Sequence, residues 1–113
     1  MHLCDESIDL WTIPLNDIGD RFQDHAQSLS AEERQRAARF KNSKDCRRFT
    51  LARGSLRSIL SQYLEAPANT IQLSYGAYGK PRLAETHQSR LKFNLSHSGD
   101  YALCALTKKH SIG

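Results

Sequence analysis

The segment that most constrains the fold is residues 43–64, which have the pattern of one long amphipathic helix. Its apolar side chains recur at three- and four-residue steps, and that spacing places them on one face of a helix. The stripe consists of Phe49, Ala52, Leu56, Ile59, Leu60 and Tyr63. Gly54 lies inside this helix and predicts a tight contact with another helix, while Pro67 follows where a helix stop is expected. A helix with one apolar face must bury that face against a second layer.

Shorter segments before the helix have strand and helix patterns of their own, and they could form part of the layer against which it packs. Residues 8–15 are apolar and β-prone and predict a first strand, and residues 16–28 have the spacing of a short amphipathic helix. Ser30 and Glu33 are placed as in a capping box, in which each side chain satisfies a backbone amide of the other residue. We therefore expect another helix from Ser30 to about Phe40.

The C-terminal part of the sequence predicts strands. Alternating or continuous apolar patterns occur at 70–75, 90–95 and 101–106, and turn-rich stretches at 76–81 and 96–100 separate them. The predicted fold class is α+β, with helices packed on a small, mostly antiparallel sheet in one unit of residues 1–113. The chain stops just after a new apolar step begins at Ile112, so we expect the sequence to be part of a longer one.

Charge is concentrated in one region of the sequence. The net charge is +4, but nine basic residues lie between positions 34 and 57 against one acidic residue, Asp45. The nine are Arg34, Arg36, Arg39, Lys41, Lys44, Arg47, Arg48, Arg53 and Arg57. Such a positive field favours a polyanionic partner, which at this point includes a phosphorylated cofactor, an acidic protein and nucleic acid.

Other classes are disfavoured by the sequence. No apolar run approaches the roughly 20 residues of a membrane helix, and the acidic N-terminus is unlike a signal peptide, so the cytoplasm is the expected location. Cys4, Cys46 and Cys104 are odd in number and far apart. They predict neither a zinc site nor a disulfide framework.

Two groups of residues are candidates for anion binding. Arg36 and Arg39 are one helical turn apart, and guanidinium groups suit phosphate oxygens, although a solvated helix face would have the same pattern. In the turn at 78–81, Gly79 permits close approach of the backbone, Lys80 can meet a phosphate and Tyr78 can stack on a base. An ordinary hairpin turn is the alternative for this second group.

A third candidate group lies at the end of the strand predicted over 90–95. The hydroxyl and amide of Ser96 and the imidazole of His97 can donate to one anionic group. Adjacent residues of a strand point to opposite faces, so we do not expect Ser96 and His97 to form a nucleophile–base pair. Capping of the strand end is the alternative.

Taken in order, these motifs resemble the surfactin-type (Sfp-like) 4′-phosphopantetheinyl transferases. The resemblance covers the strand with Trp11, the segment 30–40, and Asp45 followed by Arg47, Arg48 and Phe49. Its most specific part is Gly79-Lys80-Pro81 a dozen residues before Phe93-Asn94-Leu95-Ser96-His97-Ser98. Ser111-Ile112-Gly113 is similar to the lead-in to the family's next motif.

The resemblance implies that residues 1–113 are the N-terminal half of a pseudo-twofold enzyme that moves phosphopantetheine from coenzyme A to a serine of an acyl or peptidyl carrier protein. By that likeness Arg36 would hold the 3′-phosphate of coenzyme A, with other arginines of the basic helices assisting. The turn would line the adenine and the strand end would approach the phosphates, which adds the residues Tyr78, Gly79, Lys80, Asn94, Leu95, Ser96 and His97. Glu33 stands where some members carry lysine, which predicts weaker attraction for phosphate.

The same likeness places the Mg²⁺ ligands and the general base in a C-terminal half, so no catalytic or metal residue is expected in this chain. The chain alone is then expected to bind coenzyme A weakly, to transfer nothing, and to need a second half-domain or self-association. The alternative is a small basic module for nucleic acid or an acidic protein, or a remnant that only packs against a partner. Because no nucleic-acid motif is present, nucleic acid is the less favoured ligand.

Overall fold

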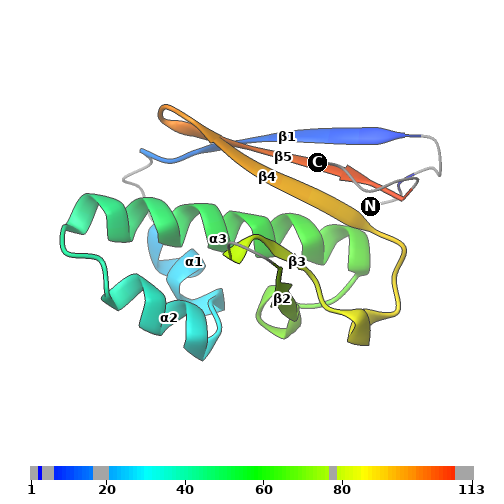
Figure 1. Cartoon of the computed structure of the whole chain (residues 1–113), viewed down its shortest axis with the longest axis horizontal. Coiled ribbons are helices and arrows are strands. Elements are labelled where there is room, and N and C mark those ends of the chain that lie inside the picture. Colours follow the sequence, from blue (N-terminus) through cyan, green and yellow to red (C-terminus); the bar gives the residue numbers. More distant parts are fainter. Residues whose placement is uncertain (1–2, 4–6, 17–20, 77–78, 109–113) are drawn as a thin grey trace.

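The computed structural model describes residues 3, 7–16, 21–76 and 79–108, and its long central helix α3 spans Ser43–Leu64. On one side of α3 lies a sheet of three strands, and on the other side lie two short helices (Figure 1). The strands of this sheet are β1 (Ile8–Pro14), β4 (Lys92–Ser98) and β5 (Tyr101–Thr107), and the helices are α1 (Arg21–Ser28) and α2 (Ala31–Ala38). The predicted α+β class is confirmed.

All the strand pairs of the described residues are antiparallel, but the strands form two sheets. The larger sheet has the order β1-β5-β4, with Trp11 opposite Cys104 and Phe93 opposite Leu106. The smaller sheet pairs β2 (Leu73–Tyr75) with β3 (Pro81–Leu83). No helix within the described ranges is long and apolar enough to cross a membrane.

Two predicted strand boundaries were wrong. The strand expected over 70–75 begins only at Leu73, because Ala68–Thr70 forms a short 3₁₀ turn in which the Thr70 amide donates to the Pro67 carbonyl at 2.9 Å. The strand expected to end at Leu95 continues to Ser98, which pairs with Tyr101. The turn predicted at 96–100 is therefore confined to Gly99 and Asp100, and Gly99 adopts a φ of 60° that glycine tolerates without strain.

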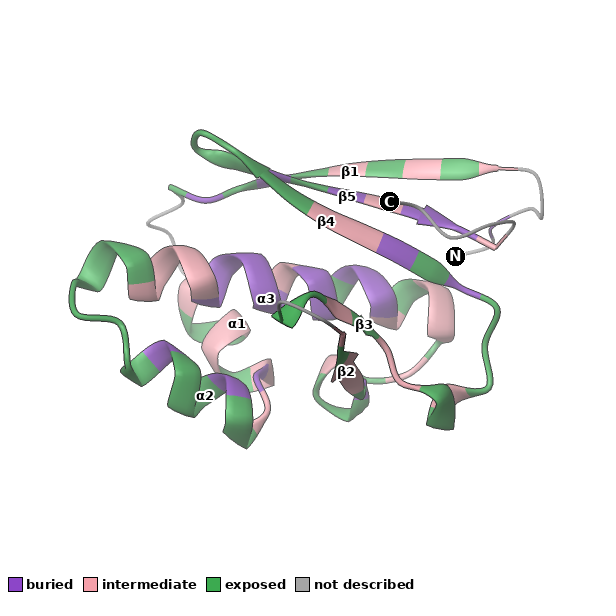
Figure 2. Cartoon of the chain, viewed as in Figure 1, coloured by how far each residue is buried: buried purple, intermediate pink, exposed green. Residues whose placement is uncertain are grey.

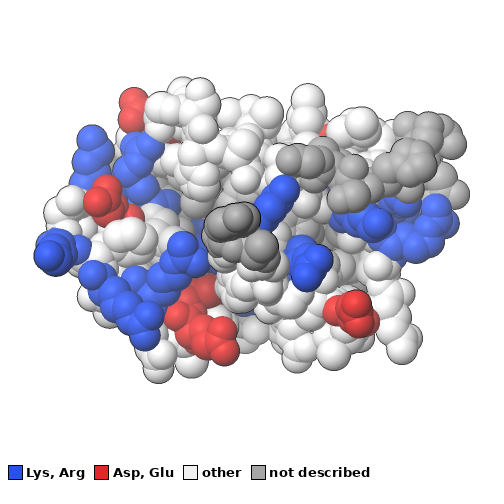
Figure 3. All heavy atoms as spheres, in the orientation of Figure 1, with Lys and Arg blue, Asp and Glu red and all other residues white. Residues whose placement is uncertain are grey.

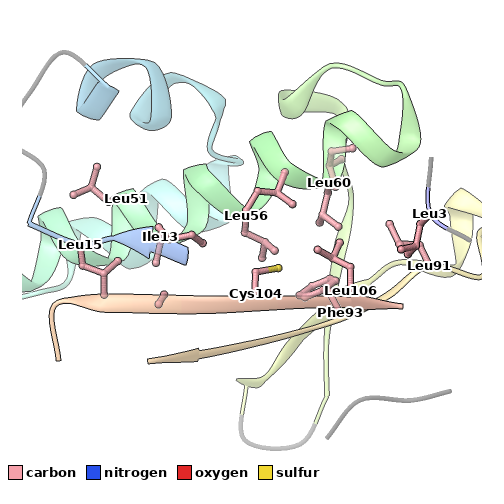
Figure 4. Packing of buried hydrophobic residues seen from close by; sticks show 14 residues of the cluster. Leu3, Ile13, Leu15, Leu51, Leu56, Leu60, Leu91, Phe93, Cys104 and Leu106 are labelled. Carbon is pink, nitrogen blue, oxygen red and sulfur yellow. The ribbon is translucent and has the colours of Figure 1, made fainter. Parts of the chain in front are cut away.

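The core forms where the apolar stripe of α3 meets the larger sheet. Leu56 and Leu60 of α3 point toward Cys104 and Leu106 of β5, with Phe93 of β4 beside them (Figure 4). Figure 2 shows the middle of α3 as buried, whereas β1 and the turn between β4 and β5 are mostly exposed. Each fully buried leucine contributes about 1.5–3 kcal/mol through removal of apolar surface from water. The predicted stripe is confirmed for Ala52, Leu56, Ile59, Leu60 and Tyr63, but Phe49 does not belong to this core and instead lies against Phe40.

Polar contacts also fix α3 against its neighbours. The Trp11 indole donates to the Tyr63 hydroxyl at 2.8 Å, and that hydroxyl donates to Asp9 at 2.6 Å, which joins β1 to the C-terminal end of α3. The capping box is confirmed, because the Glu33 amide donates to Ser30 Oγ at 3.1 Å and the Ser30 amide donates to Glu33 Oε1 at 2.8 Å. The helix that this box opens, α2, ends at Ala38, two residues before the predicted end.

Gly54 is the contact point between α3 and α1, as its place in the sequence predicts. A methyl group at this position would meet the Cβ atom of His25, with His25 Cγ at 2.7 Å and His25 Cα at 2.8 Å. These atoms belong to the backbone of α1 or lie close to it, so they cannot rotate away. Only a residue without a side chain allows the two helices to approach this closely.

We expect Gly54→Ala to lower the free energy of unfolding by about 1–2 kcal/mol, because overpacking costs more than the gain in helix propensity. Urea denaturation followed by circular dichroism measures the change. Ser58→Ala on the exposed face of α3 is the matched control and should stay within about 0.5 kcal/mol of the wild type. A Gly54→Ala variant as stable as the wild type would show that the helices can separate at no cost.

Candidate anion-binding site

Cationic side chains from several elements lie around the N-terminal half of α3. The Lys and Arg side chains gather over α2 and the first turns of α3, with others near the β2–β3 hairpin (Figure 3). The turn between β4 and β5 is fixed to the same end of α3, because Arg48 pairs with Asp100 at 3.1 Å and also donates to the carbonyl of Gly99. The β4–β5 turn, about 50 residues later in the sequence, therefore lies beside the first turns of α3.

Phe49 organises the arginines on the α2 side of this surface. The Arg36 guanidinium lies 5.2 Å from the centre of the Phe49 ring and that of Arg53 lies 5.0 Å from it, with Phe40 at 5.5 Å. Cation–π contacts of this kind hold a guanidinium in place without neutralising its charge. Arg36 is exposed, so its charge remains available to an external anion.

Two of the nine basic residues are not part of this surface, which corrects the simple charge count. Arg53 and Arg57 are buried, and both face Glu33, which is 2% exposed. Arg57 Nε donates to Glu33 Oε1 at 2.7 Å, and Arg53 Nη1 lies 3.7 Å from Glu33 Oε2. Two internal guanidinium groups thus offset the charge of Glu33 locally, and its weaker attraction for phosphate relative to a lysine at this position stays a prediction.

Arg57 and Arg53 also reach beyond Glu33. Arg57 Nη1 donates to the carbonyl oxygens of Ile71 at 2.6 Å and Ala68 at 3.0 Å, which fixes the segment leading to β2. Arg53 Nη1 donates to the Tyr75 hydroxyl at 3.0 Å, and the same guanidinium lies 5.6 Å from the centre of the Tyr75 ring. Burial lowers the pKa of Arg53, while the nearby Tyr75 and Glu33 act in the opposite direction.

The β2–β3 hairpin presents Lys80 at the surface. The Gly76 amide donates to the Lys80 carbonyl at 3.0 Å, and the Gly79 amide donates to the Gly76 carbonyl at 3.2 Å. Gly79 has a φ of 74°, in the left-handed region that favours glycine. Tyr78, the predicted stacking residue, lies outside the described residues. Beside the hairpin runs a groove of about 870 Å³ whose lining includes Lys80, Arg82, Lys92, Leu83 and Phe93.

The four predicted residues of β4 do not share one face. Strand alternation places Leu95 and His97 on the same side as the buried Phe93, facing α3, and places Asn94 and Ser96 on the opposite side. Ser96 and His97 are exposed, whereas Asn94 and Leu95 are half-buried. The structure thus links Arg36 to the hairpin that carries Lys80, through Phe49, Arg53 and Tyr75, and separates Asn94 and Ser96 from that side.

Sequence reasoning counted Arg53 only as part of the basic cluster, placed Phe49 in the apolar stripe, and assigned no role to Tyr75. Phe49, Arg53 and Arg57 follow one another at four-residue steps, so they lie on one helix face. This spacing was the signal in the sequence that could have grouped Phe49 with the two arginines. For metal binding, the described residues contain no group of three His, Cys, Asp or Glu side chains that could hold an ion. The chemistry that the described site supports is the binding of an anion.

Comparison with known proteins places the chain beside a group of transferases. The family description "4′-phosphopantetheinyl transferase, N-terminal" matches residues 16–109. The chain is 43% identical over 112 residues to the 4′-phosphopantetheinyl transferase HetI of Nostoc sp., covering 98% of this chain and 47% of that protein. It is 32% identical over 90 residues to the human L-aminoadipate-semialdehyde dehydrogenase-phosphopantetheinyl transferase, covering 77% and 29% respectively.

A third relative is the 4′-phosphopantetheinyl transferase ffp of Bacillus subtilis, with 32% identity over 77 residues that cover 68% of this chain and 34% of that protein. The chain therefore spans half or less of the length of these curated relatives.

We expect Glu33→Gln to lower the free energy of unfolding by about 3–5 kcal/mol, because it leaves two buried guanidinium groups without a compensating charge. Glutamine keeps the capping-box geometry, so the change isolates the loss of charge. Glu32→Gln, one residue earlier on the exposed side of α2, is the matched control. Equal losses for the two variants in urea denaturation would disprove a special role of the buried carboxylate.

Proposed function

The chain belongs to the 4′-phosphopantetheinyl transferase family, as its N-terminal part, and on that premise we propose that it supplies part of the coenzyme A site of a surfactin-type (Sfp-like) member. The reaction of such a member would move the phosphopantetheine arm of coenzyme A to a serine of an acyl or peptidyl carrier protein. The observation that carries the proposal is the arrangement of Arg36, Phe49, Arg53 and Tyr75, which joins α2 to the hairpin of Lys80.

The proposed roles follow the chemistry of each side chain. Arg36 is exposed and is held by Phe49, which suits a guanidinium that binds the 3′-phosphate. Lys80 and the backbone of Gly79 lie at the tip of the hairpin, where they would meet the adenine and its phosphates. His97 faces the α3 side of the sheet and would donate to a phosphate from there. The stacking role of Tyr78 stays a prediction.

The outer face of the larger sheet supports the proposal of a second half. Ile8, Leu10, Tyr101 and Leu103 on this face are 63%, 65%, 52% and 42% exposed. The face is continuous across β1 and β5, because Leu10 lies opposite Ala105 and Thr12 lies opposite Leu103. Contiguous exposed apolar surface on this scale is typical of a surface that is covered by a partner. We propose that a second half-domain, or a second copy of the chain, packs there.

Asn94 and Ser96 point to this same outer face, and Leu95 lies between them on the other side. Contacts from Asn94 and Ser96 to coenzyme A would therefore be made at the border with the second half. From the family resemblance alone, we propose that Mg²⁺ and the general base belong to that second half. Location in the cytoplasm stays a prediction.

The alternative of a basic module for nucleic acid or an acidic protein is not supported by a specific observation. Arg53 and Arg57 are turned inward to Glu33, and Arg48 is paired with Asp100, so three of the nine basic residues do not present an unpaired charge. Of the remaining six, Arg36 is held over the Phe49 ring with its charge exposed, which suits a compact phosphorylated ligand.

We expect isothermal titration calorimetry to detect coenzyme A binding by the chain, with affinity about tenfold lower in Arg36→Ala, Lys80→Ala and His97→Ala, since each change removes a charged or hydrogen-bonding contact to phosphate. Lys44→Ala, an exposed cation at the start of α3, is the matched control. Dephospho-coenzyme A should bind wild type and Arg36→Ala equally. An unchanged affinity of Arg36→Ala for coenzyme A would exclude the proposed 3′-phosphate contact.

We also expect no transfer of phosphopantetheine when the chain is incubated with an apo-carrier protein, coenzyme A and Mg²⁺, because the proposed catalytic carboxylates lie in the second half. Mass spectrometry of the carrier protein measures the product directly. Modification of the carrier serine by this chain alone would overturn the proposal that the second half supplies the catalytic groups.

A further inference from the structure

We propose that Arg53 and Tyr75 are positioning residues, which hold Arg36 and the Lys80 hairpin in one fixed arrangement before the anion binds. They do so through a stack of four side chains, Arg36–Phe49–Arg53–Tyr75, which we call the guanidinium stack. The inference rests on the proposed coenzyme A site for the identity of the ligand. It concerns Tyr75, to which the sequence assigned no role, and Arg53, which was counted only as one of the nine basic residues.

Arg53 is the fixed member of the guanidinium stack. It is 6% exposed, so it is buried behind the surface and does not itself face an external ligand. Its Nη1 atom lies 3.7 Å from Glu33 Oε2, a buried oxygen that has no hydrogen-bond partner among the described residues. Glu33 is held in turn by Arg57 at 2.7 Å and by the capping box of α2. Arg53 is therefore anchored to both α2 and α3.

Tyr75 transfers this anchoring to the hairpin. It is the last residue of β2 and lies opposite Pro81, and the next residue, Gly76, donates its amide to the carbonyl of Lys80 at 3.0 Å. The β2–β3 sheet has only three residue pairs, and an isolated two-stranded hairpin is marginally stable. The hydrogen bond from Arg53 Nη1 to the Tyr75 hydroxyl at 3.0 Å gives this short hairpin a connection to α3.

Arg36 is the other end of the guanidinium stack. It shares the Phe49 ring with Arg53, and the charge of Arg36 is close enough to contribute to the lowered pKa of Arg53, after burial as the main cause. Two like charges are thus held near each other by contacts to one aromatic ring within the chain. Such preorganisation increases affinity because the ordering of the cations does not have to occur on binding.

The test is Tyr75→Phe, which keeps the ring of the guanidinium stack and removes only the hydroxyl that accepts from Arg53. Tyr101→Phe, an exposed tyrosine on the outer face of the larger sheet, is the matched control. Without ligand, we expect the ¹⁵N order parameters of Gly76, Gly79 and Lys80 to fall toward about 0.6 in Tyr75→Phe and to stay near about 0.85 in the control.

The second measurement is coenzyme A affinity in a double-mutant cycle. Tyr75→Phe should weaken binding by about three- to tenfold, the loss expected for one hydrogen bond. In a Lys80→Ala background the same change should have less than about a twofold effect, because the cation that the hairpin positions is absent. Purely structural damage would instead lower affinity equally in both backgrounds.

The two proposals fail in different ways. Unchanged order parameters in Tyr75→Phe, or equal losses of affinity with and without Lys80, would overturn the positioning role even if the wild type binds coenzyme A. A more mobile hairpin in Tyr75→Phe together with a wild type that binds no coenzyme A would support the positioning role and sink the proposed function. If Tyr75→Phe does not fold, Arg53→Lys, which keeps the charge but shortens the reach to Tyr75, is judged by the same two criteria.

Discussion

The buried carboxylate of Glu33 connects more of this structure than any other polar group that is described. Its two oxygens face Arg57 and Arg53, its side chain caps the amide of Ser30, and Arg57 continues to the carbonyls of Ala68 and Ile71. The N-terminus of α2, the middle of α3 and the entry to β2 are therefore held by one network. A buried charge cluster of this kind adds little net stability over an apolar core but tolerates few alternative arrangements.

This network explains how α3 can serve two layers at once. The face with Leu56 and Leu60 contacts the sheet, and the face with Arg53 and Arg57 contacts α2 and the segment before β2. An apolar residue in place of Arg53 would fill the space, but it could not fix the Phe49 and Tyr75 rings or donate to the Tyr75 hydroxyl. Because Arg53 has a planar guanidinium with several donors, it can contact Phe49, Tyr75 and Glu33 together.

The parts of the fold that the sequence predicted are those determined by local pattern. The apolar period of α3, the Ser30–Glu33 capping box and the apolar, β-prone run of β1 depend on neighbours a few residues away. The missed features depend on distant contacts. Arg53 and Arg57 counted as surface charge until Glu33, 20 and 24 residues earlier in the sequence, proved to face them. The late start of β2 is a local exception: alternation predicted a strand from Thr70, but the 3₁₀ turn at Ala68–Thr70 places its start at Leu73.

The candidate site shows the same division between local and distant information. Motifs identified Arg36, Lys80 and His97 as cationic or hydrogen-bonding groups, but no motif states which face of β4 each residue occupies. Strand parity settles that point, because His97 follows Phe93 toward α3 while Asn94 and Ser96 turn to the apolar outer face of the sheet. One side of β4 therefore faces α3, and the other side belongs to the outer face of the sheet. A second half packed on Leu10 and Leu103 would lie beside Asn94 and Ser96 on the same face, so the partner that covers the apolar surface would also meet these two residues of the proposed coenzyme A site.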